Sequence, residues 1–139
     1  MKVEASADIG APPDVVWKIL TDPARLTAGT GVLKLEGRPS QGARLKLWSE
    51  VDPKRAFALR VVTFEPHALM VWRGGMPLGL FIGERRIELA GTARGTQLDL
   101  SESFTGLMAP LITRSMPDLR PSMEKFVRAV ARMAEEDAG

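Results

Sequence analysis

The sequence predicts an α+β fold in which a curved antiparallel sheet of seven strands wraps around one long C-terminal helix, with two short helices between the first and second strands. Three patterns in the 139 residues carry this prediction. Apolar and polar residues alternate over residues 3–9, as they do in a half-buried strand. Six more strand-like runs fill residues 32–104, and after Gly106 apolar residues recur three and four positions apart, which is typical of a helix.

Two short helices are predicted directly after the first strand. A pair of prolines beginning at Pro12 suits a first helical turn, and an apolar stripe continues to about Thr21. Asp22 followed by proline is typical of a second helix start, with the aspartate as N-cap. A short helix over residues 23–28 is therefore expected before the second strand.

Residues 32–104 contain six predicted strands separated by turn-forming segments rich in glycine, proline and polar residues. The five segments predicted as turns are 37–42, 52–55, 66–67, 74–79 and 91–95. Short connections of this kind join neighbouring antiparallel strands. The predicted strands are residues 32–36, 43–51, 56–65, 68–73, 80–90 and 96–104.

The C-terminal segment predicts an amphipathic helix with charged residues opposite its apolar stripe. The stripe consists of Met123, Phe126, Val127, Val130 and either Met133 or Ala134. Residues 109–116 are also helix-like, but Pro117 and Pro121 each remove a backbone donor and clash with the preceding turn. We therefore predict that both prolines interrupt the terminal helix and leave residues 107–122 as a flexible gate.

Composition indicates one ordinary globular domain over residues 1–139, because 45% of the residues are hydrophobic and 26% are charged. The absence of cysteine excludes a disulfide framework, a thiolate zinc site and a cysteine nucleophile. Charges at Lys2, Glu4 and Asp8 leave no apolar core for a signal peptide, and no apolar run is long enough for a membrane span. We expect a soluble cytoplasmic protein without stable membrane insertion.

The net charge of +2 gives little support to nucleic-acid binding, and no nucleic-acid partner is predicted. The nearest basic cluster lies near the C-terminus, where acidic residues such as Glu124 and Glu135 are interspersed with it. This mixture is typical of a solvated helix face. The basic residues of the cluster are Arg114, Arg120, Arg128 and Arg132.

Familiar catalytic and cofactor motifs are absent from the sequence. His67, the only histidine, follows Pro66 in a predicted exposed turn, and no Gly-x-Ser-x-Gly motif accompanies it. One histidine and no cysteine do not assemble a metal site. Gly29 and Gly31 lack the third glycine and the strand-to-helix context of a dinucleotide site, so no cofactor is predicted.

Seven twisted strands enclose more volume than the apolar stripe of one helix occupies, which predicts an apolar cavity between sheet and helix. A core filled by side chains is the alternative from the same pattern. The candidate lining residues alternate on the expected inner face of the sheet or lie on the helix stripe. They are Phe57, Leu59, Val61, Met70, Trp72, Phe81, Arg85, Ile87, Leu98, Leu100, Glu102, Phe104, Met123 and Val127.

Two charged residues fall on this otherwise apolar face. If residues 80–90 and 96–104 form a hairpin, Arg85 and Glu102 lie within reach of one another among apolar neighbours. A buried charge is costly unless it is paired, so we predict an inward ion pair that anchors a ligand. A register with both side chains in solvent is the alternative. In the inward arrangement Glu102 is a candidate general acid or base, and Arg85 is a candidate for polarising a carbonyl group.

Four local sequences resemble those of a known superfamily in their order and spacing. They are Ile-Gly-Ala-Pro-Pro-Asp-Val-Val-Trp at 9–17, Thr-Asp-Pro at 21–23, Glu-Pro leading to Trp-Arg-Gly over 65–74, and Glu-Ser-Phe-Thr-Gly at 102–106. On these residues the chain resembles the polyketide cyclase/dehydrase branch of the START-related (SRPBCC) superfamily, which includes the birch-pollen allergen. The resemblance implies a helix-grip fold with a deep hydrophobic cavity. Members include small-molecule carriers, aromatase/cyclases, quinone-binding proteins and co-chaperone relatives.

Three functions follow as hypotheses. The first is binding or transport of a hydrophobic or aromatic small molecule in the cavity, with lipid binding included. The second is a polyketide cyclase/dehydratase-like enzyme, which needs a carboxylate facing the cavity. The third is a co-chaperone-like interaction module, which needs an exposed apolar patch. The sequence leaves the identity of the ligand, catalytic activity and the oligomeric state open.

Overall fold

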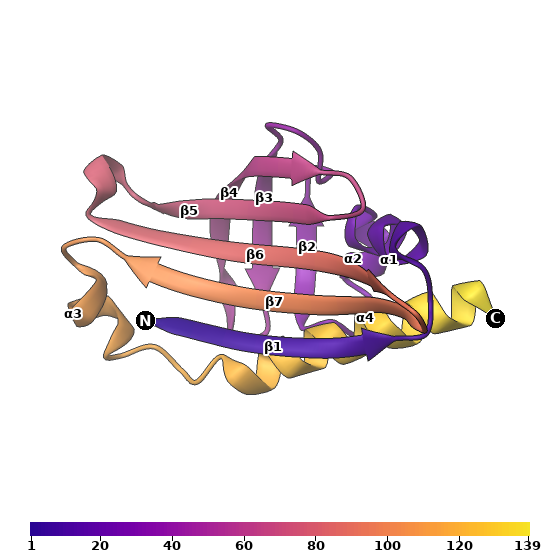
Figure 1. Cartoon of the computed structure of the whole chain (residues 1–139). Helices are drawn as coiled ribbons and strands as arrows, with labels where there is room; N and C mark the ends of the chain where they lie inside the picture. The colour runs from indigo at the N-terminus through magenta and orange to yellow at the C-terminus, as the bar shows by residue number, and fades with distance from the viewer.

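The computed structural model describes residues 1–139, and its seven strands form one antiparallel sheet (Figure 1). The strands lie in the order β1-β7-β6-β5-β4-β3-β2, so strands consecutive from β2 to β7 are neighbours and β1 lies beside β7. This arrangement confirms the predicted fold class. The strands are β1 (Lys2–Ile9), β2 (Val32–Glu36), β3 (Arg44–Ser49), β4 (Asp52–Glu65), β5 (Leu69–Met76), β6 (Phe81–Thr92) and β7 (Gly95–Thr105).

Helices lie between β1 and β2 and after β7. They are α1 (Pro13–Leu20), α2 (Pro23–Leu26), α3 (Ala109–Thr113) and α4 (Arg120–Ala138), and a 3₁₀ turn, η1 (Pro77–Gly79), joins β5 to β6. α2 begins as predicted, because the Asp22 carboxylate accepts a hydrogen bond from the Ala24 amide at 3.0 Å. None of the helices is both long and apolar enough to cross a membrane.

The sheet curves over α4, which crosses beneath the strands in Figure 1. In that view β1, β7, β6 and β5 run across the front, while β2 and β3 stand behind them. α4 packs most closely against β1 and α1. Its apolar stripe, with Phe126 and Val130 almost fully buried, joins a hydrophobic core of 27 residues. The helix stripe and the inner face of the sheet therefore belong to one core.

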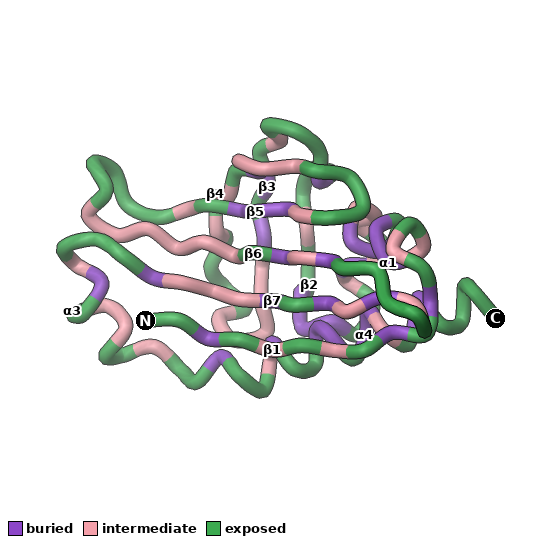
Figure 2. The backbone as a smooth tube through the Cα atoms, in the orientation of Figure 1, coloured by how far each residue is buried: buried purple, intermediate pink, exposed green.

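The two ends of the molecule differ in how they are covered. At the end that we call the closed end, α1, α2 and the C-terminal half of α4 surround almost fully buried side chains such as Val16 and Leu26. At the other end, which we call the open end, the β5–β6 and β7–α3 connections project past the first turn of α4 (Figure 1). Figure 2 shows mostly half-buried and exposed residues in these connections.

The segment 52–55, predicted as a turn, instead begins β4. The chain reverses one step earlier, at Glu50 and Val51. Pro53 is tolerated within β4 because this strand pairs with β5 only from Arg60 onwards. The missing amide of the proline therefore breaks no hydrogen bond to β5.

The predicted turn at 74–79 is also shorter than expected. β5 continues through Gly74 and Gly75 to Met76, and both glycines pair with residues of β6. The turn is confined to η1 at residues 77–79, because pairing between β5 and β6 continues through the glycines that by sequence favour a turn.

The break before the terminal helix is present, but only one of the two prolines lies in it. Pro117 lies in the non-helical link between α3 and α4. Pro121 lies in the first turn of α4, where a missing amide donor removes no helical hydrogen bond. The prediction that Pro121 interrupts the helix is therefore wrong, and the flexible gate over 107–122 stays a prediction.

Candidate ligand-binding site

One row of side chains crosses the inner face of the sheet, which faces α4. In register across β4, β5, β6, β7 and β1, the row consists of Val61, Trp72, Arg85, Glu102 and Val3. Directly paired residues point to the same face of a sheet, because side chains alternate between the two faces along every strand. The row therefore places two ionisable side chains and one indole together in an apolar layer.

Arg85 and Glu102 form an ion pair in this row. The Arg85 Nε atom donates a hydrogen bond to Glu102 Oε1 at 2.7 Å, and the Arg85 Nη2 atom donates to the same oxygen. The two side chains are 19% and 16% exposed, so the inward ion pair is confirmed and the solvent-facing register is not the one adopted. Arg85 Nη1 and Glu102 Oε2 make no hydrogen bond within the chain and stay free for a ligand.

Trp72 adds a third polar atom to the row. The residue is 1% exposed, and its Nε1 is the one buried side-chain nitrogen or oxygen that has no hydrogen-bond partner. A buried donor without an acceptor costs about 1–3 kcal/mol. A ligand oxygen placed against the indole would remove this cost.

Apolar side chains cover the row on the side of the closed end, and others contact it from α4. Arg85 also lies against the ring of Phe126 on α4, with 5.2 Å between its Cζ atom and the ring centroid. The predicted lining residues that are almost fully buried in this layer are Val61, Met70, Ile87, Leu98, Leu100, Met123 and Val127. The ion pair is therefore closed off from solvent on this side.

Glycines and stacked aromatic rings border the row on the side of the open end. Gly74 pairs with Gly83 two residues along the strands from Trp72 and Arg85. A Cβ atom on Gly83 would lie 3.5 Å from the Phe104 ring, so the glycine lets this ring lie close to the sheet. Phe104 in turn stacks on half-buried Phe81, with ring centroids 5.9 Å apart and an angle of 14° between the planes.

The last two predicted lining residues lie on β4 and are half buried. Leu59 packs over Gly74, and the Phe57 ring lies under the Arg55 guanidinium, 5.1 Å from its Cζ atom. The two main hollows of the molecule lie on the outer face of the sheet, and neither lies between the sheet and α4. A preformed inner cavity therefore stays a prediction.

Exposed apolar side chains surround the open end. Met76 and Leu78 come from the β5–β6 connection, and Leu107 and Leu111 come from the segment around α3, with exposures from 42% to 97%. A hydrogen bond of 2.8 Å from the Met108 amide to the Leu80 carbonyl holds the two connections together. Sequence reasoning missed this apolar lip because its two halves are far apart along the chain.

Few other side chains offer chemistry. His67 lies in the exposed turn between β4 and β5 with a φ of 68°, and its ring meets that of Trp17 edge-on at 6.4 Å. No group of three or more histidine, aspartate or glutamate side chains is placed to hold a metal ion.

A family model described as polyketide cyclase/dehydrase and lipid transport matches residues 1–137. The chain belongs to this family. No curated protein sequence matches this family member. Among solved structures, the protein MLL2253 from Mesorhizobium loti is similar to it, with a TM-score of 0.75 and 16% identity over 98% of both chains.

Two further structures similar to this polyketide cyclase/dehydrase family member come from biosynthetic pathways. The di-domain ARO/CYC protein StfQ of the steffimycin pathway has a TM-score of 0.75 at 15% identity, over 99% of this chain and 52% of StfQ. DynU16, from the dynemicin biosynthetic locus, has a TM-score of 0.70 at 24% identity, over 99% of this chain and 48% of DynU16. The chain thus spans about half of each, and the likeness shows a shared fold.

Proposed function

We propose that this protein binds a hydrophobic or aromatic small molecule between the inner face of the sheet and α4, and that the ligand carries a hydrogen-bond acceptor. One observation carries the proposal: the unpartnered Trp72 Nε1 donor lies beside the Arg85–Glu102 ion pair in an otherwise apolar layer. A ligand carbonyl or phenolic oxygen would accept the indole hydrogen bond, while its rings pack against the surrounding side chains.

The free atoms of the ion pair define the ligand class further. Arg85 Nη1 offers a donor and Glu102 Oε2 offers an acceptor, which together match a ketone next to a hydroxyl group. The pair is already neutral, so a charged ligand would leave an uncompensated charge in the apolar layer. The stacked rings of Phe81 and Phe104 favour a flat aromatic body at the open end. We infer that half-buried side chains at this end move to admit the ligand.

A pair of matched ligands tests the role of the indole. 2-Acetylnaphthalene carries a carbonyl acceptor, whereas 2-isopropenylnaphthalene has nearly the same shape without one. We expect calorimetry to show about tenfold tighter binding of the acetyl compound, since one hydrogen bond in an apolar site contributes about 1.5 kcal/mol. Trp72→Phe should remove the difference. Trp48→Phe is the control, because Trp48 lies beside Lys34 and points to the outer face. Equal binding of the two compounds by the unaltered protein would refute the proposal.

Larger side chains in the inner layer test whether the ligand binds there. Leu100→Trp adds volume next to the row, and we expect it to weaken the binding of both naphthalenes with the circular dichroism spectrum unchanged. Met70→Trp should do the same from β5. Native mass spectrometry of freshly purified protein then identifies any molecule that the unaltered protein retains and the Leu100→Trp variant loses.

A second function, cyclisation or dehydration of a polyketide-like substrate, is favoured by the free Oε2 oxygen of Glu102 beside Arg85. The carboxylate would take a proton from the carbon next to a carbonyl, and Arg85 would stabilise the resulting enolate oxygen. Glu102→Gln should then abolish turnover of a short poly-β-ketone. An unaltered protein that leaves the poly-β-ketone unchanged would contradict this second function and leave the binding function in place.

A further inference from the structure

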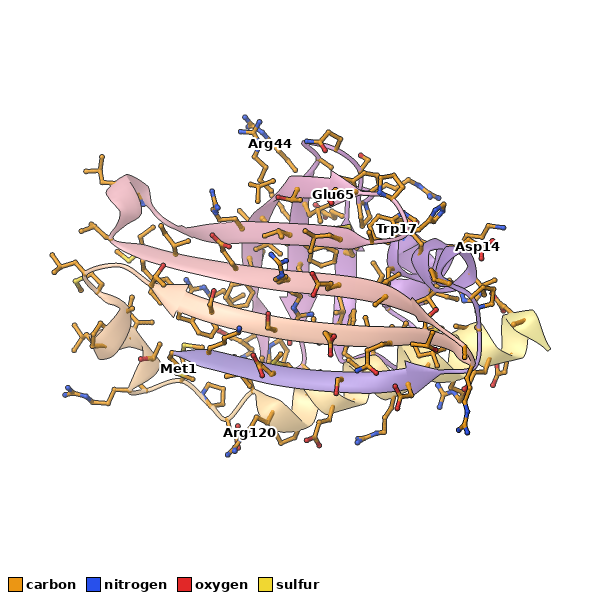
Figure 3. All side chains as sticks on the ribbon, viewed as in Figure 1. Met1, Asp14, Trp17, Arg44, Glu65 and Arg120 are labelled. Carbon is orange, nitrogen blue, oxygen red and sulfur yellow. The ribbon has the colours of Figure 1, made fainter.

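We propose that the outer face of the sheet carries a second binding site, for a linear chain of linked phosphoryl groups. The site is built on three arginines in register on neighbouring strands: Arg44 on β3 pairs with Arg60 on β4, and Arg60 pairs with Arg73 on β5. All three are exposed, whereas the residues beside them in sequence face the core. Figure 3 shows Arg44 projecting from the sheet on the side away from α4.

The arginine row borders a hollow of about 580 Å³. The adjoining part of the hollow is lined by Ala58 and Gly75, whose small size leaves room beside the long arginine side chains. Lys46, opposite Ala58 in the register, and Glu36, opposite Lys46, complete the polar part of the rim. The hollow is therefore lined by four cationic side chains and one carboxylate.

Most of this positive charge has no partner. Arg73 pairs with Glu84 at 2.8 Å, but Arg44, Lys46 and Arg60 form no ion pair. Glu36 is bridged to Lys34 at 3.4 Å. Like charges placed directly opposite one another on neighbouring strands destabilise a sheet. The arginine row is therefore unfavourable by itself and becomes favourable when an anion lies along it.

The other main hollow on the outer face provides the contrast. It measures about 370 Å³, lies over β1, β6 and β7, and is also lined by charged residues. There the cations are matched, because Lys2 pairs with Glu4 and Arg86 pairs with Glu88, each at 3.0 Å. Uncompensated positive charge therefore distinguishes the arginine hollow from the other one, in which Asp99 leaves an excess of negative charge.

The spacing of the row selects the ligand. Neighbouring strands lie about 4.8 Å apart, so three of them spread the guanidinium groups over about 10 Å. A single phosphate group reaches two neighbouring arginines, whereas a chain of phosphoryl groups presents oxygens along the whole row. The planar guanidinium fork suits such oxygens because it donates two parallel hydrogen bonds. A free oligophosphate and the phosphate end of a nucleotide share this chemistry.

The test measures tripolyphosphate binding by calorimetry and by the thermal unfolding midpoint. We expect Arg60→Gln to weaken tripolyphosphate binding at least tenfold, and Arg44→Gln to weaken it severalfold. Without the anion, Arg60→Gln should raise the unfolding midpoint, because it removes the repulsion in the row. Arg86→Gln in the other hollow is the matched control and should bind tripolyphosphate as the unaltered protein does.

Sulfate and ATP complete the design. Sulfate should bind much more weakly than tripolyphosphate, since it cannot span the row. If ATP binds more tightly than tripolyphosphate, the ligand is a nucleotide. If the two bind equally, the ligand is a free oligophosphate. The proposal is overturned if Arg60→Gln binds tripolyphosphate within twofold of the unaltered protein, or if Arg86→Gln loses as much affinity as Arg60→Gln.

Discussion

The closed and open ends of this helix-grip fold use the same sheet and the same helix differently. At the closed end, distant parts of the chain hold α4: Glu135 accepts a hydrogen bond from the Gly10 amide at 2.8 Å, and Arg25 pairs with Asp137 at 3.0 Å. At the open end, Asp118 bonds its near neighbour Arg120. The candidate binding chemistry extends toward the open end. The comparison teaches that the tightly buried helix contacts are concentrated at the closed end, whereas the free polar atoms lie in the inner row between the two ends.

The largest expected effect is on the free energy of unfolding, when one apolar residue from each end is replaced by alanine. Leu20→Ala at the closed end removes a fully buried side chain, so we expect a loss of about 3 kcal/mol in the free energy of unfolding. Phe81→Ala at the open end removes a half-buried ring and should cost about 1 kcal/mol. Urea unfolding measures both. Equal losses would mean that the two ends are packed alike.

The ion pair lies between the two ends and gives the next effect. Arg85→Met leaves the Glu102 carboxylate without its cation, and Glu102→Gln leaves the Arg85 guanidinium without its anion. Each single change should therefore cost about 1–3 kcal/mol in the free energy of unfolding. The double variant should cost less than the sum of the two. Additive losses, each below about 0.5 kcal/mol in urea unfolding, would show two independent surface charges and would remove the proposed anchor.

Hydrogen exchange compares the two ends without any substitution. We expect amides over residues 107–119 to exchange at least tenfold faster than those over 123–133, because α3 and its link have few buried contacts. Similar protection of the two segments would show that the open end is as rigid as the terminal helix and would remove the gate.

The smallest expected effect concerns pH at the start of α4. The hydrogen bonds from Arg120 hold the pKa of the exposed Asp118 carboxyl below its usual value of 3.8. A lowered folded-state pKa stabilises the protein above the unfolded-state pKa, and this stabilisation is lost as the pH falls through the folded-state pKa. Asp118→Asn should therefore lower the unfolding midpoint slightly at pH 7. The difference should shrink below pH 3.8, and a constant difference would contradict this assignment.

Much of the fold and part of the site were predictable from local patterns. Alternation located the first strand and helical spacing located the terminal helix, because burial of one face leaves its period in the sequence. Turn-forming segments separated the other strands, and the Asp22-Pro pair located α2. The facing positions of Arg85 and Glu102 followed from the turn between β6 and β7, which sets the offset of the two strands. The turn predicted at 52–55 was wrong, since proline suits a turn and an unpaired strand edge equally well.

The sequence by itself determined which side chains alternate toward the core and which helices begin at proline or aspartate. Only the tertiary structure decided that the Trp72 indole lacks an acceptor, because its neighbours come from other strands of the sheet. The tertiary structure also decided that the three arginines form a row. Its alignment depends on strand registers that include shifts next to Leu47 and Val61, and a slip of one residue would send a strand's side chains to the other face.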